Sequence, residues 1–459
     1  MPAKAPAPVY VLGVGMTKFL KPRGKVDYPE MGYEAGIKAM LDAHINYDDV
    51  EQGIACYVYG DSACGQRVFY QFGMTGIPIY NVNNNCGSGA TGLAMGRNAV
   101  AYGQADCVLV VGFEKMMPGS LPTIWKDRAS PLGRSAEMVK KTKGSIEGSF
   151  ALRMFGYAGE EYIENYGASP RDFAEIARIN HRHSKHNPYA QFQDEYSLEQ
   201  ILESPKMGGH LTKLQCCPTS DGAAAAVLVS QAFLDQRPEL KSQAILIAGQ
   251  GSATDRPDLF AGSLESAAGS SITKAAVKTA LDQAGLKSVD EIKVCELHDC
   301  FAPAEMLALE SLGFAEKGKA FEYVRRGDIT YGGKTVVNPS GGLLSKGHPL
   351  GATGLAQCAE LVWQLRGWAN NRLVEGAHAA LSHNVGMGGF GVVTVYKRAD
   401  GKQATAVDSA DVARLSGVGY NPAVEARGFT EAQASLVRSK SSRCDWAIDE
   451  SQKKVESHF

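Results

Sequence analysis

The sequence predicts an α/β protein built from two related halves. Buried-strand patterns followed by helical patterns predict the class, and a repeated motif predicts the duplication. Residues 86–94 read Cys-Gly-Ser-Gly-Ala-Thr-Gly-Leu-Ala, and residues 348–356 read His-Pro-Leu-Gly-Ala-Thr-Gly-Leu-Ala, an offset of 262 residues. We therefore expect His348 to occupy in the second half the position that Cys86 occupies in the first.

The first half opens with the apolar run Val9–Met16, which has the pattern of a buried strand. Gly32–His44 is predicted to be a helix, because Ile37, Met40 and Leu41 share one helical face. A short strand-like run from Ile79 leads into the Cys86 turn and a helix that ends near Ala101. Two more strands are expected at 53–59 and 106–112, the second apolar throughout its middle.

The pattern changes between residues 116 and 218, which are polar and carry amphipathic helical stretches near 157–166 and 170–183. We interpret this stretch as an insertion folded over the first half. The tail from Arg398 has few large apolar residues, and only 407–415 has a short helical pattern. The predicted domains are 1–115 continued at 219–269 (first half), 116–218 (inserted loop domain), 270–398 (second half) and 399–459 (polar, partly ordered extension).

Bulk properties exclude several classes of function. The formal net charge of −2 gives no electrostatic basis for binding nucleic acid or an anionic membrane. No apolar run reaches the length of a membrane span, and the start MPAKAPAP lacks the apolar core of a signal peptide. The 10 cysteines lie at irregular spacings without a zinc-type cluster, so we expect reduced, intracellular thiols and no metal site.

Cys86 is the first candidate for chemistry. It stands at the start of a glycine-rich helix, where unpaired backbone N–H groups and the helix dipole favour a thiolate. Gly87 and Gly89 leave room for a substrate to approach closely. The alternative is a buried, inert cysteine in a tight turn. The repeat favours catalysis, because it gives Cys86 a partner, His348, at the equivalent helix start.

Three other stretches carry candidate groups, and each follows a strand or opens a helix, where open α/β sheets bind ligands. His348 can act as the base for a Cys86 thiolate, and Cys300 can supply a second acid or base. The glycines at 386, 388 and 389 offer backbone N–H groups for an oxyanion. Structural roles remain open for each: a turn histidine, a buried small residue and a plain glycine turn. Asp299 is expected to cap a turn or helix.

These stretches resemble the thiolase superfamily over residues 8–397, and more closely its sterol-carrier-protein-type members. Ordinary thiolases carry Asn-Glu-Ala-Phe where this chain has His298-Asp-Cys-Phe301, and a catalytic cysteine where it has Asn384. The sterol-carrier type places its second cysteine inside the His-Asp-Cys-Phe motif. The fused lipid-carrier domain of some members has no expected counterpart here. The motifs are Asn83-Asn-Asn-Cys86, Cys217-Pro-Thr-Ser-Asp-Gly-Ala-Ala-Ala-Ala, His298-Asp-Cys-Phe301 and Asn338-Pro-Ser-Gly-Gly-Leu-Leu-Ser-Lys-Gly-His348-Pro-Leu-Gly-Ala-Thr-Gly.

The resemblance implies thiolase-like halves in a layered αβαβα arrangement and an acyltransferase that cleaves 3-oxoacyl-CoA with CoA. Cys86, activated by His348, attacks the 3-keto carbon, and backbone N–H groups of Cys86 and Gly386 hold the oxyanion. His298 and His348 stabilise the enolate oxygen of the departing acetyl-CoA or propanoyl-CoA, and Cys300 protonates its carbon. CoA then removes the acyl group from Cys86. The implied substrates include 2-methyl-branched and sterol side-chain esters.

The resemblance also implies partners and setting. CoA is a co-substrate and no bound cofactor is expected. The family implies a homodimer in lipid metabolism, with roles in fatty acid β-oxidation and lipid transport. The end Ser457-His458-Phe459 keeps the small–basic–hydrophobic order of a peroxisomal signal, so we expect a peroxisomal, otherwise cytoplasmic or mitochondrial, protein. The expected contacts to acyl chain or CoA are a Met154-Phe155-Gly156 turn, Arg182, Lys185, His186, Cys217 and a non-catalytic Asn384.

Two other functions stay open on the sequence. A condensing enzyme such as a ketosynthase can use Cys86, His298 and His348 without Cys300. A non-catalytic acyl-CoA or lipid-binding protein on the same scaffold is the second, because the ordinary second cysteine is missing. Loss of thiolysis on replacing Cys300 separates thiolase from condensing enzyme, and an acyl adduct on Cys86 separates either enzyme from a binder.

Overall fold

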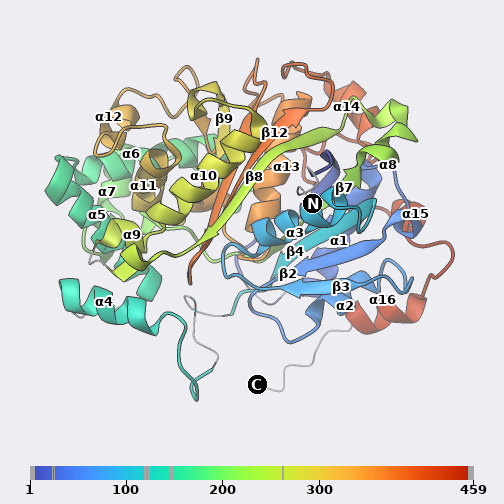
Figure 1. The fold of residues 1–459 in the computed structure, drawn as a ribbon, viewed down its shortest axis with the longest axis horizontal. Coiled ribbons are helices and arrows are strands. Elements are labelled where there is room, and N and C mark those ends of the chain that lie inside the picture. Colours follow the sequence, from blue (N-terminus) through green and yellow to red (C-terminus); the bar gives the residue numbers. More distant parts are fainter. Residues whose placement is uncertain are drawn as a thin grey trace, which may run out of the picture.

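A single ten-stranded sheet lies at the centre of the computed structural model, which describes residues 6–22, 24, 26–117, 121, 125–144, 149–260 and 263–452. Figure 1 shows the blue first half beside the yellow-to-orange second half. The first half contributes β1 (Val9–Met16), β2 (Gln52–Cys56), β3 (Ile79–Val82), β4 (Cys107–Glu114) and β7 (Gly222–Ser230). The second contributes β8 (Ile245–Thr254), β9 (Val294–Glu296), β10 (Val336–Val337), β11 (Ala380–Gly386) and β12 (Phe390–Arg398).

The strand order confirms the duplication. It runs β10-β9-β11-β12-β8-β1-β7-β4-β2-β3. From the centre outward, each half presents its first, fifth, fourth, second and third strand. The directions also agree, since β2 pairs parallel to β3 and β4, as β9 does to β10 and β11. The halves join where β1 pairs antiparallel to β8, at Tyr10–Leu246 and Val11–Ile245.

Helices form three layers around the two halves of the sheet, which gives the expected αβαβα arrangement. Residues of α3 and α13 share one apolar core with alternate residues of strands from both halves, so these two helices are central. Helix α1 packs with the opposite face of the first half, and α10 and α11 pack with that of the second. The helices of the two halves are α1 (Tyr28–Asp42), α2 (Cys64–Phe69), α3 (Ser88–Ala101), α8 (Gln231–Asp235), α9 (Leu264–Ala267), α10 (Ser270–Ala284), α11 (Ala302–Leu312), α12 (Ala320–Arg325) and α13 (Thr353–Arg366).

Glycines of the repeated motif let α3 and α13 approach each other. A Cβ on Gly354 would lie 2.3 Å from the backbone nitrogen of Ala90. A Cβ on Gly89 would lie 2.7 Å from the carbonyl oxygen of Gly351. Both distances are shorter than any real carbon contact, so side chains are excluded where the helices meet. The motif thus brings the Cys86 and His348 turns together.

The insertion folds against the second half, with its helices in teal and green at the left of Figure 1. The interpretation that it folds over the first half is therefore wrong, because the apolar residues of α5 and α6 are buried in one core with those of α10 and α11. The predicted helix at 157–166 starts earlier, at Phe150, because Ser149 caps it by accepting the N–H of Leu152. Met154 and Phe155 therefore lie within a helix, and the expected turn at 154–156 is wrong. The insertion holds α4 (Gly133–Lys143), α5 (Phe150–Tyr166), α6 (Pro170–Ser184), α7 (Leu198–Glu203), β5 (Lys206–Gly208) and β6 (Leu211–Thr212).

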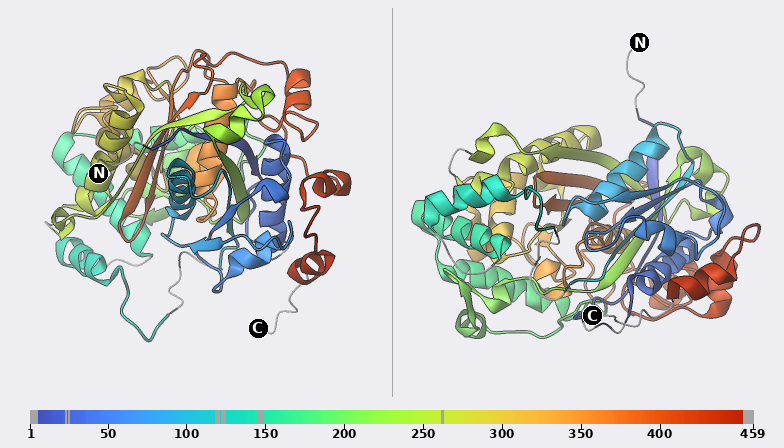
Figure 2. Two further views of the ribbon diagram at one scale, coloured as in Figure 1. Left: turned by 45° about the vertical axis from the view of Figure 1, so that its right-hand side comes forward. Right: turned by 90° about the horizontal axis from the view of Figure 1, so that it is seen from below.

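The extension after residue 398 lies along the first half, on the side away from the insertion (Figure 2). Arg438 is buried there and its Nε donates to the carbonyl oxygen of Gln71 at 3.0 Å. Ser457–Phe459 lie outside the described residues. The strand order places β8 with the second half, whereas the predicted division had assigned residues 219–269 to the first half; the other domain boundaries stay predictions. None of the described helices has the length and apolar character needed to cross a membrane. The extension contributes α14 (Ser409–Leu415), α15 (Glu431–Val437) and α16 (Asp445–Gln452).

Candidate active site

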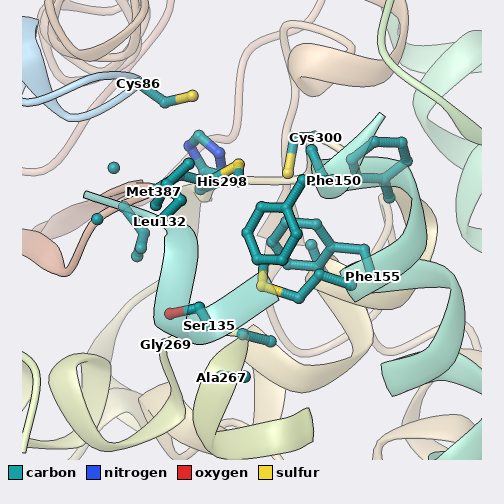
Figure 3. Close-up of a pocket in the computed structure, with 18 of the residues that line it drawn as sticks. Cys86, Leu132, Ser135, Phe150, Phe155, Ala267, Gly269, His298, Cys300 and Met387 are labelled. Carbon is teal, nitrogen blue, oxygen red and sulfur yellow. The ribbon is translucent and has the colours of Figure 1, made fainter. Parts of the chain in front are cut away.

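A cavity of about 800 Å³ lies where the two halves and the insertion meet. Figure 3 shows Cys86, His298 and Cys300 around it, with Phe150 and Phe155 from α5 on the side of the insertion. Most of its wall is apolar, and its reactive groups are thiols and imidazoles. These groups are Cys86, Cys216, Cys217, Cys300, His298, His348 and His383.

Cys86 immediately precedes Gly87, the N-cap residue of α3. Asn85, just before it, adopts a left-handed φ of 50°. The amide of Asn85 donates to the carbonyl oxygen of Met387 at 2.5 Å, which joins this turn to the glycine-rich loop after β11. A Cβ on Gly386 would lie 2.0 Å from the carbonyl oxygen of Asn84, so only glycine fits where that loop crosses the turn.

The protonation state of Cys86 differs from the sequence expectation. Burial raises the pKa of the Cys86 thiol to about 12, although the N–H groups of Met387 and of Cys86 itself partly offset this by donating toward the sulfur. Burial thus outweighs the helix N-terminus, and the resting group is a neutral thiol. A thiolate at Cys86 would therefore need a base that removes this proton.

His348 lies beside Cys86 and is the candidate for this base, and its surroundings fix which of its ring nitrogens is free. Its Nδ1 lies 2.7 Å from the hydroxyl of Thr353, which donates its own hydrogen to the carbonyl oxygen of Pro349 at 3.0 Å. The hydroxyl must therefore accept, so Nδ1 carries the hydrogen and Nε2 presents a lone pair. Nε2 is buried without a hydrogen-bond partner among the described residues. Burial, and then the nearby charge of Lys346, lower the pKa of His348 to about 3.

His298 has the opposite tautomer. The amide nitrogen of Asn384 lies 3.2 Å from its Nδ1 and can only donate, so Nδ1 accepts and Nε2 carries the hydrogen. Burial holds the pKa of His298 well below its usual range, with the neighbouring His348 and His383 adding to the effect. His298 is therefore a neutral N–H donor, suited to hold an oxygen that gains negative charge.

The three groups converge. The Cys86 sulfur and a ring nitrogen each of His298 and His348 all lie within 4.8 Å of one another. The two imidazole rings meet edge to face, with centroids 5.2 Å apart and an interplanar angle of 82°. A thiol with a base and a second donor so close can attack a carbonyl carbon and stabilise the charge produced.

Cys300 lines the same cavity from the loop between β9 and α11. Burial raises the pKa of the Cys300 thiol well above its usual value, so it holds a proton at neutral pH. Asp299 beside it accepts the backbone N–H groups of Leu343 and Leu344, at the start of a π-helical turn that leads to His348. Asp299 thus caps that turn, as expected, and ties the Cys300 loop to the His348 loop.

The expected substrate contacts divide into two groups. Met154, Phe155 and Cys217 line the cavity. Asn384 is buried behind His298 and does not line it. Arg182 and Lys185 do not lie at the cavity, contrary to expectation, because Arg182 donates to Thr330 and Lys185 pairs with Glu195 at the surface.

Sequence reasoning missed Thr353, Met387 and the cavity-lining Arg134. The sequence did contain a clue to Thr353, because the repeated motif of the first half has Thr91 at the equivalent position. Both hydroxyls donate to the carbonyl oxygen four residues earlier, Thr91 to Gly87 at 2.8 Å and Thr353 to Pro349 at 3.0 Å. The sequence contained no such clue to Met387, since this residue contributes only its backbone N–H, which donates toward the Cys86 sulfur.

Comparison with known protein families matches nearly the whole chain before the extension. Residues 9–232 match the thiolase N-terminal domain, and residues 261–398 match the thiolase C-terminal domain-like family. Sterol carrier protein 2 of Gallus gallus is 53% identical over 391 residues, which cover 84% of this chain and 71% of that protein. Acetyl-CoA acetyltransferase of Methanothermobacter thermautotrophicus is 35% identical over 404 residues, 85% of this chain and 99% of that protein.

Solved structures share the fold. The Ltp2-ChsH2(DUF35) aldolase superposes with a TM-score of 0.70 at 23% identity, covering 86% of this chain and 98% of that one. Human mitochondrial 3-ketoacyl-CoA thiolase in complex with CoA superposes with a TM-score of 0.63 at 19% identity, covering 87% and 98%. The duplicated layered arrangement is therefore common to these proteins.

Proposed function

Because the chain belongs to the thiolase family, we propose that its cavity carries out the thiolytic cleavage of 3-oxoacyl-CoA through an acyl-Cys86 intermediate. One observation carries the assignment of residues: Cys86, His298 and His348 converge within 4.8 Å, in a cavity that also holds Cys300. The reaction converts a 3-oxoacyl-CoA and CoA into a shortened acyl-CoA and acetyl-CoA or propanoyl-CoA.

Attack begins from a neutral pair. Nε2 of His348 removes the Cys86 proton as the sulfur bonds to the 3-keto carbon, and the Nδ1–H bond to Thr353 keeps the imidazolium oriented. The keto oxygen becomes negative and is held by backbone N–H groups of the Cys86 turn and of the Gly386–Met387 loop. Stabilisation is therefore directed at charge that appears only during the reaction.

Cleavage breaks the C2–C3 bond and leaves its electron pair on C2. The thioester oxygen of the resulting enolate accepts from Nε2–H of His298, whose orientation Asn384 fixes. Cys300 gives its proton to C2, and the proton held by His348 restores the Cys300 thiol. CoA then attacks the acyl-Cys86 thioester and its thiol proton returns to Cys86 through His348, so all protons balance.

The phosphates of CoA lie over the N-terminal part of α4. Arg134 is exposed and also lines the cavity, which places it at the opening. Lys140 and Lys141 are also exposed, but they lie in the last turn of the helix and do not line the cavity. An exposed cation at the opening, such as Arg134, suits a pyrophosphate or 3′-phosphate. This position replaces the one expected around Arg182 and Lys185.

The acyl chain occupies the part of the cavity between the two catalytic cysteines and α5. Phe155 stacks on Phe301 there, with ring centroids 5.3 Å apart, and Met154 and Phe150 complete an apolar wall. A cavity of about 800 Å³ has room for a bulky chain. Because the volume alone does not select a chain type, we propose 2-methyl-branched and sterol side-chain esters as substrates on the resemblance to the sterol-carrier type, in lipid breakdown by β-oxidation.

Thiolysis rates with straight and 2-methyl-branched 3-oxoacyl-CoA esters test the substrate class directly. Cys300→Ala tests the mechanism, and we expect it to lower thiolysis by about 10²–10⁴-fold while an acyl adduct still forms on Cys86. Full turnover of Cys300→Ala would exclude Cys300 as the acid and favour the condensing enzyme. The absence of any adduct on wild-type Cys86, with CoA still bound, would favour the binding protein.

We also propose a homodimer and a peroxisomal location. β3 is an edge strand of the ten-stranded sheet, and its Tyr80 is 47% exposed, so it can pair with the same strand of a second copy. Light scattering of the full chain tests the dimer. The location rests on the order of Ser457, His458 and Phe459, and loss of import on deleting these three residues tests it.

A further inference from the structure

The Cys86, His298 and His348 side chains have the composition and spacing of a metal site. Each offers one ligand atom, a sulfur or a ring nitrogen, and these atoms lie within 4.8 Å of one another. Zinc bound tetrahedrally by such ligands needs ligand atoms about 3.3–3.7 Å apart, given bonds of about 2.0–2.3 Å. Side-chain rotations that shorten the separations by about 1 Å suffice.

We propose that this cluster binds zinc, as an inhibitory site distinct from the reaction itself. Thiolate and imidazole ligands suit zinc, whereas magnesium and calcium prefer oxygen. Three protein ligands leave the fourth position open to the cavity for water or a small thiol. Binding replaces the Cys86 S–H bond by a sulfur–zinc bond, and the thiol proton leaves to solvent.

His348 already has the tautomer that such a site requires. Its Nδ1–H is held by Thr353 at 2.7 Å, and its buried Nε2 has no hydrogen-bond partner among the described residues, so Nε2 is the nitrogen left to bind a metal. Metal-bound histidines usually donate their other N–H to an oxygen in this way, which orients the ring. No rearrangement beyond a side-chain shift is needed on this side.

His298 needs a change of tautomer, and Asn384 permits it. The amide oxygen of Asn384 is buried and has no hydrogen-bond partner in the described part of the chain, while its nitrogen lies 3.2 Å from Nδ1 of His298. Rotating the amide by half a turn exchanges the two atoms. The oxygen then accepts from Nδ1–H, and Nε2 of His298 becomes free to bind metal. The His298–Asn384 pair can thus adopt two arrangements that fill the same space. In one, Nε2 of His298 carries a hydrogen for catalysis; in the other, Nε2 is free to bind metal.

Zinc and substrate exclude each other, because both require the Cys86 sulfur. The ion removes the nucleophile, the base and the enolate donor at once, so bound enzyme is inactive. Acylation of Cys86 in turn blocks the metal. The inference uses the same residues as the proposed reaction, but it is tested by metal binding, so an enzyme that bound no zinc would leave the thiolase assignment intact.

Equilibrium dialysis of the purified, chelator-treated full chain with zinc, together with cobalt spectroscopy, tests the site. We expect one zinc per chain at the site and, with cobalt in its place, a thiolate-to-metal charge-transfer band. Cys86→Ser removes the band and weakens zinc binding by at least 100-fold. Cys444→Ser, which removes a half-buried thiol of the extension, leaves both unchanged. Cobalt binding without the band, or equal zinc binding by Cys86→Ser, overturns the proposal.

Asn384 variants give a second, independent measurement. Asn384→Asp supplies a carboxylate that can only accept hydrogen bonds. It therefore stabilises the metal-binding tautomer of His298 and should tighten zinc binding about 10-fold. Asn384→Leu offers no acceptor and weakens zinc about 10-fold. Zinc should protect Cys86 from alkylation by iodoacetamide, measured by mass spectrometry. The protection should be strongest in Asn384→Asp and weakest in Asn384→Leu. An Asp variant no tighter than the Leu variant contradicts the role given to Asn384.

Discussion

Thr353 accepts the Nδ1–H of His348 at 2.7 Å and donates its own hydrogen to the carbonyl oxygen of Pro349, so it determines that Nε2 of His348 carries the free lone pair. The relationship is set by the chain itself, because Thr353 is the first residue of α13 and His348 lies in the turn before it.

Thr353→Val should lower kcat for thiolysis by about 10–100-fold with little change in KM. The variant leaves a buried Nδ1–H without an acceptor, which costs about 1–3 kcal/mol and grows when the ring is charged. Steady-state kinetics measure the effect, and Thr353→Ser, which keeps the hydroxyl, is the matched control. Equal losses in both variants would point to packing instead of orientation.

Alkylation of Cys86 by iodoacetamide should accelerate with pH, about tenfold per unit between about pH 6 and pH 9, without a plateau. The pKa of the Cys86 thiol is raised to about 12 and that of His348 is lowered to about 3, so the thiolate fraction grows throughout this range. Mass spectrometry follows Cys86, with the half-buried Cys444 as internal reference. A rate independent of pH near neutrality would indicate a resting thiolate–imidazolium pair.

Asn384→Leu should lower kcat about 10–100-fold, because it removes the donor that keeps the hydrogen of His298 on Nε2. Asn384→Asp should lower it further, since a carboxylate favours the hydrogen on Nδ1 and leaves the enolate without a donor. Binding of CoA, measured by calorimetry, should be similar in both. Equal activity of the two variants would show that Asn384 does not control the tautomer of His298.

Arg134→Ala should raise KM for CoA about three- to tenfold and leave kcat unchanged, since a phosphate contact at the cavity opening is lost. Arg182→Ala is the comparison that the sequence alone would have favoured. Its guanidinium bonds Thr330 away from the cavity, so KM should not change. The reverse outcome would restore the original assignment of Arg182 to CoA.

Gly354→Ala should destabilise the fold by about 1–3 kcal/mol and reduce activity, because its Cβ would lie 2.3 Å from the Ala90 nitrogen where α13 meets α3. Gly428→Ala is the matched control, since its Cβ would have no atom of the described residues within 4 Å. Urea unfolding gives the comparison. A fully stable Gly354→Ala variant would mean that the helices can separate without loss.

Fold class, duplication and the four reactive side chains could be predicted from sequence, because each depends on local pattern. The repeat of Gly-Ala-Thr-Gly placed Cys86 opposite His348, and strand order then agreed in both halves. The thiolate expected for Cys86 was wrong, since helix position is local while burial depends on the assembled cavity.

CoA contacts were harder still. Arg182 and Arg134 both lie in the polar insertion, and nothing in their neighbours along the chain shows which one faces the cavity. The tautomers of His298 and His348 depend on Asn384 and Thr353, which lie 86 and 5 residues away. Only the fold reveals such partners, although the shared threonine of the repeat was a clue.

The division of the site between two equivalent half-sheets has a kinetic consequence. Cys86 comes from one half and His348 from the other, so the cluster forms only when the two halves pack together. Recovery of turnover during refolding should therefore follow the packing of the two halves against each other. We expect this step within milliseconds to minutes, after secondary structure has formed. The rate at which activity returns during refolding therefore measures the assembly of the two halves, with substrate turnover as the only signal needed.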